Sequence, residues 1–360
     1  MLQPSLYDHR CHTAITHLSI TGRWIYALAI SFCAGGYRRL FARLGVLLFA
    51  ALAAVFASLA AADEPPTRVQ IGFQKGSILT LLKARGTLDE ALKARGIGAR
   101  WLEFPAGPQM LEALNLGNID FATVGDAPPI FAQAAGADLV YVSRTPANPK
   151  TEVIVVPKDS PLHSVADLAG RAVALNKGSD VNYLLVKALA AAGLDYSRIT
   201  PRYLKPADAR AAFQQGAVDA WAIWDPYYAE AQVNAGARLL TDATDLVSHY
   251  SFYLSSRDFA ETHPEIVDLF NQQIAAVSRW AEAHPDDAAQ ILSRATALPV
   301  SIWQRAIART HYGLAPVDDD VLAEQQTLAD TFHDIGLIPR EVDVSTTRWA
   351  RSAESVAATR

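Results

Sequence analysis

Cysteine is almost absent from this chain. The 360-residue sequence has two cysteines and two methionines. Both cysteines, Cys11 and Cys33, precede a long apolar run near the N-terminus. The chain after that run therefore has no disulfide, no thiolate nucleophile and no cysteine-bound metal.

Signatures of catalysis and of nucleic-acid binding are also missing. The sequence has no G-x-S-x-G, H-E-x-x-H or P-loop motif, and its histidines lack the spacing of metal ligands. Asp318, Asp319 and Asp320 open a predicted helix, where acids suit the helix dipole. The net charge is -5 and there is no long run of Lys and Arg, so a phosphate backbone is a poor partner. We therefore expect that the protein is not an enzyme, that it holds no metal or other cofactor, and that it does not bind nucleic acid.

The N-terminus has the pattern of an export signal. Arg38 and Arg39 precede an apolar run at 44–62, which is rich in Ala and Leu and ends in small residues. This pattern predicts that residues 1–62 are a leader with a signal peptide cleaved near Ala62. An uncleaved membrane anchor is the alternative, because the run approaches spanning length. The two arginines leave open whether export is Sec-dependent or uses the twin-arginine route.

The remaining chain alternates between strand and helix patterns. The full sequence is 51% apolar and 19% charged, so the protein can bury a sizeable core. Its alternation predicts an α/β fold with mostly parallel sheets flanked by helices. The predicted strands are 69–73, 100–104, 121–124, 139–142, 153–156, 172–175, 201–204 and 220–224.

Beyond about Arg257 the pattern changes to a helical C-terminal section. The predicted helices are 266–283, 286–295, 301–312 and 318–334. The chain length suggests about two domains. Because no low-complexity linker is present, we expect short crossing segments to join two lobes.

One short pattern occurs at two predicted strand-to-helix turns. The first turn is Gln74, Lys75, Gly76 and Ser77, and the second is Asn176, Lys177, Gly178 and Ser179. Gly lets the backbone approach a ligand, Ser can cap a helix, and free N–H groups favour a negative charge. The repeat predicts one anion-binding turn in each lobe. The structural alternative is a capped helix with an exposed lysine at each turn.

Two other strand ends are candidate ligand contacts. Gly125 and Asp126 follow a predicted strand; we expect the Gly125 N–H to face the anion and Asp126 to orient the turn or close the lobes. In the alternative, Asp126 only caps the next helix. Trp224, Asp225 and Tyr227 stand at another strand end, where α/β sheets bind ligands. One prediction is that these aromatic side chains form an apolar wall for a ligand. The alternative is that they only pack against one another between helices.

Longer segments carry a resemblance to a known family. They read IGFQKGSILTLLKARGTLDEAL, EFPAGPQMLEALNLGNIDFATVGDAPPIFAQAAGADLVYV, EVIVVPKDSPLHSVADLAG, NKGS, YLKPADARAAFQQGAVDAWAIWDPYYA and SFYLSSRDFAE. They are similar to the aliphatic sulfonate-binding proteins of ABC uptake systems, which belong with the taurine- and nitrate-binding proteins. The likeness runs from about Thr67 to Glu261 and more loosely to about Val344.

This resemblance implies a two-lobe periplasmic-binding-protein-like fold of type II, with the ligand between the lobes. It implies a periplasmic monomer that delivers its ligand to an ABC permease and its ATPase. Lobe I would comprise 63–156 and 249–360, and lobe II would comprise 157–248.

The resemblance also implies a set of ligand contacts. They are Gln74, Lys75, Gly76, Ser77, Gly125, Asp126, Lys177, Gly178, Ser179, Trp224, Asp225 and Tyr227. Asn176 and Asp180 depart from the Gln and Ser expected around the second turn. The added carboxylate of Asp180 weakens the expected attraction of that turn for an anion.

Residues and resemblance together predict a protein that captures aliphatic sulfonates for import and sulfur acquisition. A sulfonate stays ionised at physiological pH, so it suits N–H, hydroxyl and ammonium donors. Its tail can lie on Trp224 and Tyr227, where each buried methylene contributes about 0.8 kcal/mol. The alternatives are a same-fold binding protein for taurine, nitrate or a thiamine-precursor pyrimidine, and a small-molecule-processing enzyme on the same frame.

Overall fold

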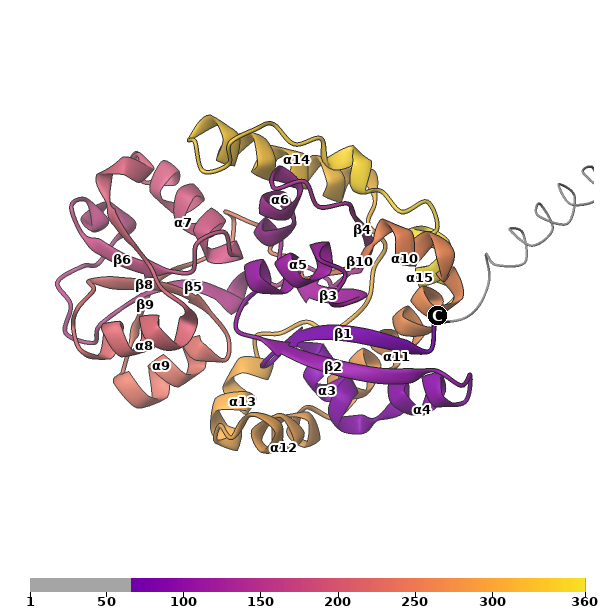
Figure 1. Cartoon of the computed structure of the whole chain (residues 1–360). Coiled ribbons are helices and arrows are strands. Elements are labelled where there is room, and N and C mark those ends of the chain that lie inside the picture. Colours follow the sequence, from indigo (N-terminus) through magenta and orange to yellow (C-terminus); the bar gives the residue numbers. More distant parts are fainter. Residues whose placement is uncertain (1–65, 360) are drawn as a thin grey trace, which may run out of the picture. The chain divides into compact units, whose positions relative to one another are not determined.

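Two five-stranded sheets covered by helices make up the described part of the chain (Figure 1). The computed structural model describes residues 66–359. The predicted leader at 1–62 lies outside these residues. Between 66 and 359, no helix is long and apolar enough to cross a membrane.

The first sheet has the strand order β2-β1-β3-β10-β4. Its β1 is parallel to β2 and β3, whereas β10 is antiparallel to both β3 and β4. The central β3 is buried along its whole length, which explains its continuous apolar sequence. The strands are β1 (Arg68–Gln74), β2 (Gly98–Phe104), β3 (Phe121–Val124), β4 (Leu139–Arg144) and β10 (Phe252–Ser256).

The second sheet repeats this plan in the order β7-β6-β8-β5-β9. Its β6 is parallel to β7 and β8, and β5 is antiparallel to β8 and β9. Each sheet thus has one strand that runs against the others, and the prediction of mostly parallel sheets is confirmed. The strands are β5 (Glu152–Val156), β6 (Ala172–Leu175), β7 (Thr200–Tyr203), β8 (Ala220–Trp224) and β9 (Arg238–Asp242).

Helices cover both faces of each sheet (Figure 1). On the first sheet, side chains of α3, α4 and α11 pack in one core cluster and those of α5, α6 and α14 in another. On the second sheet, α7 packs on one face and α8 and α9 on the other.

The helices up to the end of β9 are α3 (Ile78–Arg85), α4 (Thr87–Lys93), α5 (Gly107–Asn115), α6 (Ala127–Ala134), α7 (Asp180–Ala191), α8 (Pro206–Gln214) and α9 (Tyr227–Ala235). Those after β10 are α10 (Arg257–Thr262), α11 (Pro264–Ala283), α12 (Pro285–Thr296), α13 (Val300–Ile307), α14 (Asp319–Asp334) and α15 (Ser352–Ala357). Short 3-10 helices occur at Pro149–Thr151, Val165–Leu168, Tyr196–Arg198 and Val344–Thr347.

The helical C-terminal section is confirmed, with one difference in length. The helix predicted at 301–312 ends at Ile307, because Arg309 and the residues after it turn toward the second sheet. The acids at the start of α14 have the predicted role: the Asp318 side chain accepts a hydrogen bond from the Val321 N–H at 3.1 Å. Strands β9 and β10 had no counterpart in the sequence prediction.

The chain crosses between the sheets twice through short segments. One segment joins β4 to β5 and the other joins β9 to β10. The lobe boundary predicted after Val156 assigns β5 to the first lobe, whereas β5 forms its hydrogen bonds with β8 and β9 of the second sheet. The change of sheet therefore falls between Arg144 and Glu152.

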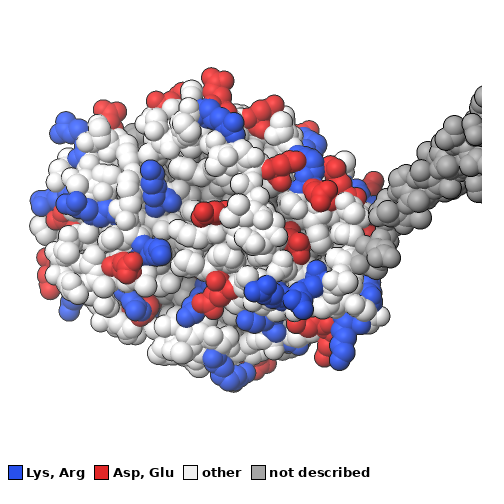
Figure 2. All heavy atoms as spheres, viewed as in Figure 1, with Lys and Arg blue, Asp and Glu red and all other residues white. Residues whose placement is uncertain are grey.

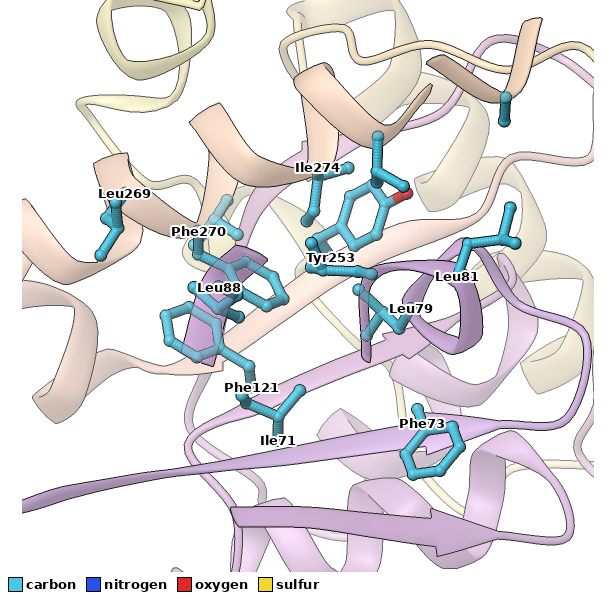
Figure 3. Close-up of a cluster of buried hydrophobic side chains, with 14 of the residues drawn as sticks. Ile71, Phe73, Leu79, Leu81, Leu88, Phe121, Tyr253, Leu269, Phe270 and Ile274 are labelled. Carbon is cyan, nitrogen blue, oxygen red and sulfur yellow. The ribbon is translucent and has the colours of Figure 1, made fainter. Parts of the chain in front are cut away.

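A stacked aromatic pair lies in the core of the first sheet. The rings of Phe121 in β3 and Phe270 in α11 are 4.1 Å apart, and Ile71 and Tyr253 lie beside them (Figure 3). Phe270 is 1% exposed. The pair ties α11 to the centre of the sheet.

Replacing Phe270 by Ala should lower the free energy of unfolding by about 3–5 kcal/mol, because it leaves a cavity in a close-packed core. Urea denaturation of residues 63–360 would measure the change. Leu116→Ala is the control, since Leu116 is 67% exposed and its loss should change stability by less than about 0.5 kcal/mol. Equal effects of the two substitutions would contradict this account of the core.

Candidate functional site

A cavity lies where strand ends of both sheets come together. Its volume is ≈ 150 Å³. Its lining comes from the turn after β1, the end of β3, both crossing segments, the start of α7, the end of β8 and the region around α13. The predicted ligand contacts that line it are Gln74, Lys75, Gly76, Ser77, Gly125, Trp224 and Asp225.

The first predicted anion turn forms one wall of this cavity. Gly76 has a φ of 90°, and a Cβ there would lie 2.7 Å from the Trp303 ring and 2.9 Å from Pro226. Only glycine fits this conformation and this space. The Ser77 hydroxyl donates to the Gln74 carbonyl at 3.0 Å instead of capping α3. The turn is therefore held by its own hydrogen bonds.

Lys75 brings a positive charge to this turn. Its side chain is half exposed, and its Nζ lies 3.7 Å from Glu103 Oε1. An exposed pair at this distance is weak, so the ammonium group can exchange the carboxylate for a ligand. Lys75 is the one Lys or Arg among the cavity-lining residues of the described chain.

The turn after β3 is filled by an acid from the second sheet's helix α7. The Ala127 N–H donates to Asp180 Oδ1 at 3.3 Å. A Cβ on Gly125 would lie 2.1–2.3 Å from the Asp180 carboxylate atoms, so glycine is what makes room for this group. Asp126 occupies the N-cap position of α6, but its side chain makes no capping hydrogen bond. It is Asp180 that accepts from the start of α6.

The second predicted anion turn does not line the cavity. Lys177, Gly178 and Ser179 are absent from the lining, whereas the next residue, Asp180, is part of it. The Ser179 hydroxyl donates to the Asn176 carbonyl at 2.7 Å, and the Gly178 N–H donates to Asn182 Oδ1 at 3.2 Å. These polar groups are already bonded within the turn. The exposed Lys177 lies over the Tyr203 ring, with its Nζ 5.5 Å from the ring centre.

The apolar side of the cavity combines β8 with the region around α13. Trp224 lines the cavity, and Tyr227 packs behind it in an edge-to-face contact at 6.4 Å. Trp303, Ile307 and Tyr312 complete this side, and our sequence prediction did not include them. The Trp303 indole is held by a 2.8 Å hydrogen bond to the Thr296 hydroxyl. The signal for two of these residues was their helical spacing, since Trp303 and Ile307 are four residues apart in α13 and fall on one face.

Asp225 joins the second sheet to the segment that follows α13. Its carboxylate accepts two hydrogen bonds from Arg309, at 2.8 and 2.9 Å. Burial raises the pKa of Asp225, and the Arg309 guanidinium offsets part of this rise. The guanidinium also lies over the Tyr228 ring at 4.2 Å and donates to Gln232. Asp225 is thus committed to an ion pair between the two sheets, although it also lines the cavity.

Several polar groups at the cavity are buried without a hydrogen-bond partner among the described residues. The Tyr253 hydroxyl is one of them, and Tyr253 is 0% exposed (Figure 3). His249 Nδ1 lies 3.3 Å from Glu152 Oε2 without a well-aligned hydrogen bond. Burial lowers the pKa of His249 to about 3, so this imidazole is neutral at physiological pH. Tyr253 and His249 were not among the predicted contacts.

Between 66 and 359, no group of three His, Cys, Asp or Glu side chains is placed to hold a metal ion. On the face shown in Figure 2, Lys and Arg are interspersed with Asp and Glu, with no continuous basic surface. The cavity itself is lined by both polar groups and aromatic side chains, a combination suited to a small polar molecule with an apolar part.

Two α/β units that meet at a ligand-sized cavity and are joined by two crossing segments define the periplasmic-binding-protein class of folds. The family model described as NMT1/THI5 like matches residues 93–288. A putative aliphatic sulfonates-binding protein of Escherichia coli is 45% identical over 84% of this chain and 95% of its own length. The chain belongs to the NMT1/THI5-like family and to its aliphatic sulfonate-binding branch.

Solved structures agree with this assignment. The periplasmic aliphatic sulphonate binding protein of Escherichia coli has a TM-score of 0.72 and 45% identity, with 79% of this chain and 92% of that chain covered. The alkanesulfonate-binding protein of Xanthomonas axonopodis pv. citri, solved with MOPS bound, has a TM-score of 0.75 and 40% identity, with 80% and 99% covered. The family resemblance predicted from the sequence is confirmed.

Arg309→Ala should lower the free energy of unfolding by about 3–5 kcal/mol, because it leaves the Asp225 carboxylate buried without its partner. The double variant with Asp225→Ala should recover part of the loss, since it removes the stranded charge. Chemical denaturation measures both. Glu103→Ala, which removes the exposed partner of Lys75, is the control and should cost less than about 1 kcal/mol. If the loss of unfolding free energy in the double variant equalled the sum of the two single losses, that result would contradict a direct interaction between Asp225 and Arg309.

Proposed function

We propose that this protein captures aliphatic sulfonates in the cavity between its two sheets and delivers them to an ABC importer. The observation that carries the proposal is the meeting of the Gln74–Ser77 turn and an aromatic side, formed by Trp224 and Trp303, at one cavity. The names of the relatives that share the fold over most of their length support the same ligand class.

The polar end of the cavity suits a permanently ionised anion. A sulfonate accepts hydrogen bonds but exchanges no proton, so it needs donors that stay protonated. Lys75 supplies an ammonium group, and the unpartnered Tyr253 hydroxyl supplies a neutral donor. We place the sulfonate at this end, against the turn after β1.

The apolar side suits the organic tail of such a ligand. Trp224, Trp303 and Ile307 offer flat and aliphatic surface, and each methylene buried there contributes about 0.8 kcal/mol. In this proposal each sheet carries one lobe, and a ligand that touches both favours the closed arrangement. The lobes would hold the ligand without changing it.

Export and partners complete the proposal. The leader pattern at 1–62 and the periplasmic relative support an exported protein that acts outside the cytoplasm. There, as a monomer, it would dock on a membrane permease driven by an ATPase. The neutral-to-acidic charge and the absence of catalytic motifs agree with a carrier rather than an enzyme.

Calorimetric titration of residues 63–360, refolded to remove carried-over ligand, should show that affinity for alkanesulfonates rises from ethanesulfonate to octanesulfonate. Trp224→Ala should weaken octanesulfonate about tenfold or more and ethanesulfonate much less, because only the long tail reaches the indole. Equal losses would contradict the aromatic wall. Tighter binding of nitrate, sulfate or taurine in the same panel would identify a different ligand. Mass spectrometry after incubation with the ligand would reveal any product and so an enzymatic activity.

The two equivalent lysines provide a matched test of where the anion binds. Lys75→Ala should weaken octanesulfonate about tenfold, because a hydrogen bond to a charged group contributes about 1.5–3 kcal/mol. Lys177→Ala should change the affinity less than about twofold, since Lys177 does not line the cavity. Calorimetry at low and at physiological salt separates direct contact from screening. A larger effect from Lys177 would restore the second turn as a ligand contact.

A further inference from the structure

The cavity between the two sheets is small for the longer ligands proposed for it. Its ≈ 150 Å³ match a cavity that holds one benzene, a molecule of about six non-hydrogen atoms. Ethanesulfonate is about this size, whereas octanesulfonate has about twice as many non-hydrogen atoms. The tail of a long alkanesulfonate therefore needs space that the cavity itself does not contain.

Such space lies directly beside the cavity. A pocket of ≈ 330 Å³ is formed by the end of α11, the start of α12 and the end of α13, around Ala281, Pro285 and Ala308. We call it the outer pocket, because Pro285 and Ala308 are exposed to solvent. The outer pocket and the cavity share a wall, whose residues are Ile307, Thr310 and Tyr312.

Tyr312 is the part of this wall that can turn aside. Ile307 is 8% exposed and packs in the core, and the Thr310 hydroxyl donates to the Ala306 carbonyl at 3.1 Å. Tyr312 lies in the non-helical segment between α13 and α14 and is partly exposed. Its backbone N–H donates to Glu282 Oε2 at 3.3 Å, but its hydroxyl has no hydrogen bond among the described residues. Rotation of this side chain would open the cavity into the outer pocket.

The charges of the two spaces favour one direction for the ligand. Lys75 lines the cavity, whereas the described residues that line the outer pocket include the acids Glu282 and Asp286 and no Lys or Arg. A sulfonate is attracted to Lys75 and repelled by the two carboxylates, so its place is in the cavity. An uncharged tail can instead lie on the apolar surface of Pro285 and Ala308.

We propose that the outer pocket is a tail-binding site. The tail of a long alkanesulfonate passes Tyr312 and lies against Ala308, while the sulfonate stays in the cavity. Tyr312 is then the specificity-determining residue for chain length. This inference rests on the proposed function, because it assumes that the cavity holds a sulfonate. It adds a second compartment to the site and a side chain that controls access to it.

The first test closes the outer pocket. Ala308→Trp places a large ring there and should weaken octanesulfonate about tenfold or more, because two or more methylenes lose their burial. Ethanesulfonate should lose less than about twofold, since the cavity holds all of it. Ala295→Trp, at an exposed alanine of α12 outside both spaces, is the matched control and should change neither affinity. Calorimetry on residues 63–360 measures the affinities, and thermal unfolding establishes that the variants are folded.

The second test locates the tail without relying on affinity. Residues 63–360 contain no cysteine, so the thiol of Ala308→Cys can be alkylated selectively with N-ethylmaleimide. Saturating octanesulfonate should slow this reaction about fivefold or more, because its tail covers the thiol, and saturating ethanesulfonate should slow it less than about twofold. Ala295→Cys should react at the same rate with either ligand or with none. Intact-mass measurements over time follow the reaction.

A third variant removes the ring of Tyr312. Tyr312→Ala should raise the ratio of octanesulfonate affinity to ethanesulfonate affinity about threefold or more, because no side chain has to be displaced. Tyr312→Phe keeps the ring and should keep the ratio of the unaltered protein. A lower ratio in Tyr312→Ala would overturn the role of Tyr312, because the ring would then be a surface on which the tail lies.

Ethanesulfonate separates a failure of the tail site from a failure of the proposed function. If neither ethanesulfonate nor octanesulfonate bound the unaltered protein, the proposed function itself would be wrong. If octanesulfonate bound tightly but neither responded to Ala308→Trp nor protected the thiol of Ala308→Cys, the tail site alone would be overturned.

Discussion

The site depends on one constraint: the chain crosses twice between two sheets and holds strand ends of both against one cavity. The crossing segments are short, and the Asp225–Arg309 ion pair adds a contact between the residue that follows β8 and the segment after α13. Groups far apart in the sequence, such as Lys75 and Trp224, therefore face the same space. In hinged proteins, a ligand that touches both sides of such a cavity stabilises the closed arrangement, and this couples binding to a change of shape.

The cavity has few charged side chains in its lining, and they differ in whether a partner of opposite charge is present. Lys75 is the sole Lys or Arg in the lining of the described chain, and the Asp225 carboxylate is occupied by Arg309. Asp180 keeps a carboxylate without a matching cation, and burial raises its pKa only to about 6.

Much of the fold was predictable from local pattern. The strands around Phe121 and Ala220 follow from short apolar runs, and the long C-terminal helices follow from apolar periodicity. Both signals are properties of neighbouring residues. Strands β9 and β10 were missed because their sequences are short, partly polar and flanked by turn-forming residues. Whether these segments form strands depends on their pairing with β5, β3 and β4. The turn at Gln74–Ser77, which lines the cavity, was found for the same local reason, since it lies at the end of a predicted strand.

The sequence by itself determined the α/β class, the family and a turn that lines the cavity, because strand-to-helix turns carry their chemistry in consecutive residues. The tertiary structure decided which of two similar turns reaches the cavity. Lys177 lies outside it while Asp180 lies within, and Trp303 and Tyr253 join from distant elements. These contacts depend on how the two sheets are brought together, and no short segment of the chain encodes that geometry.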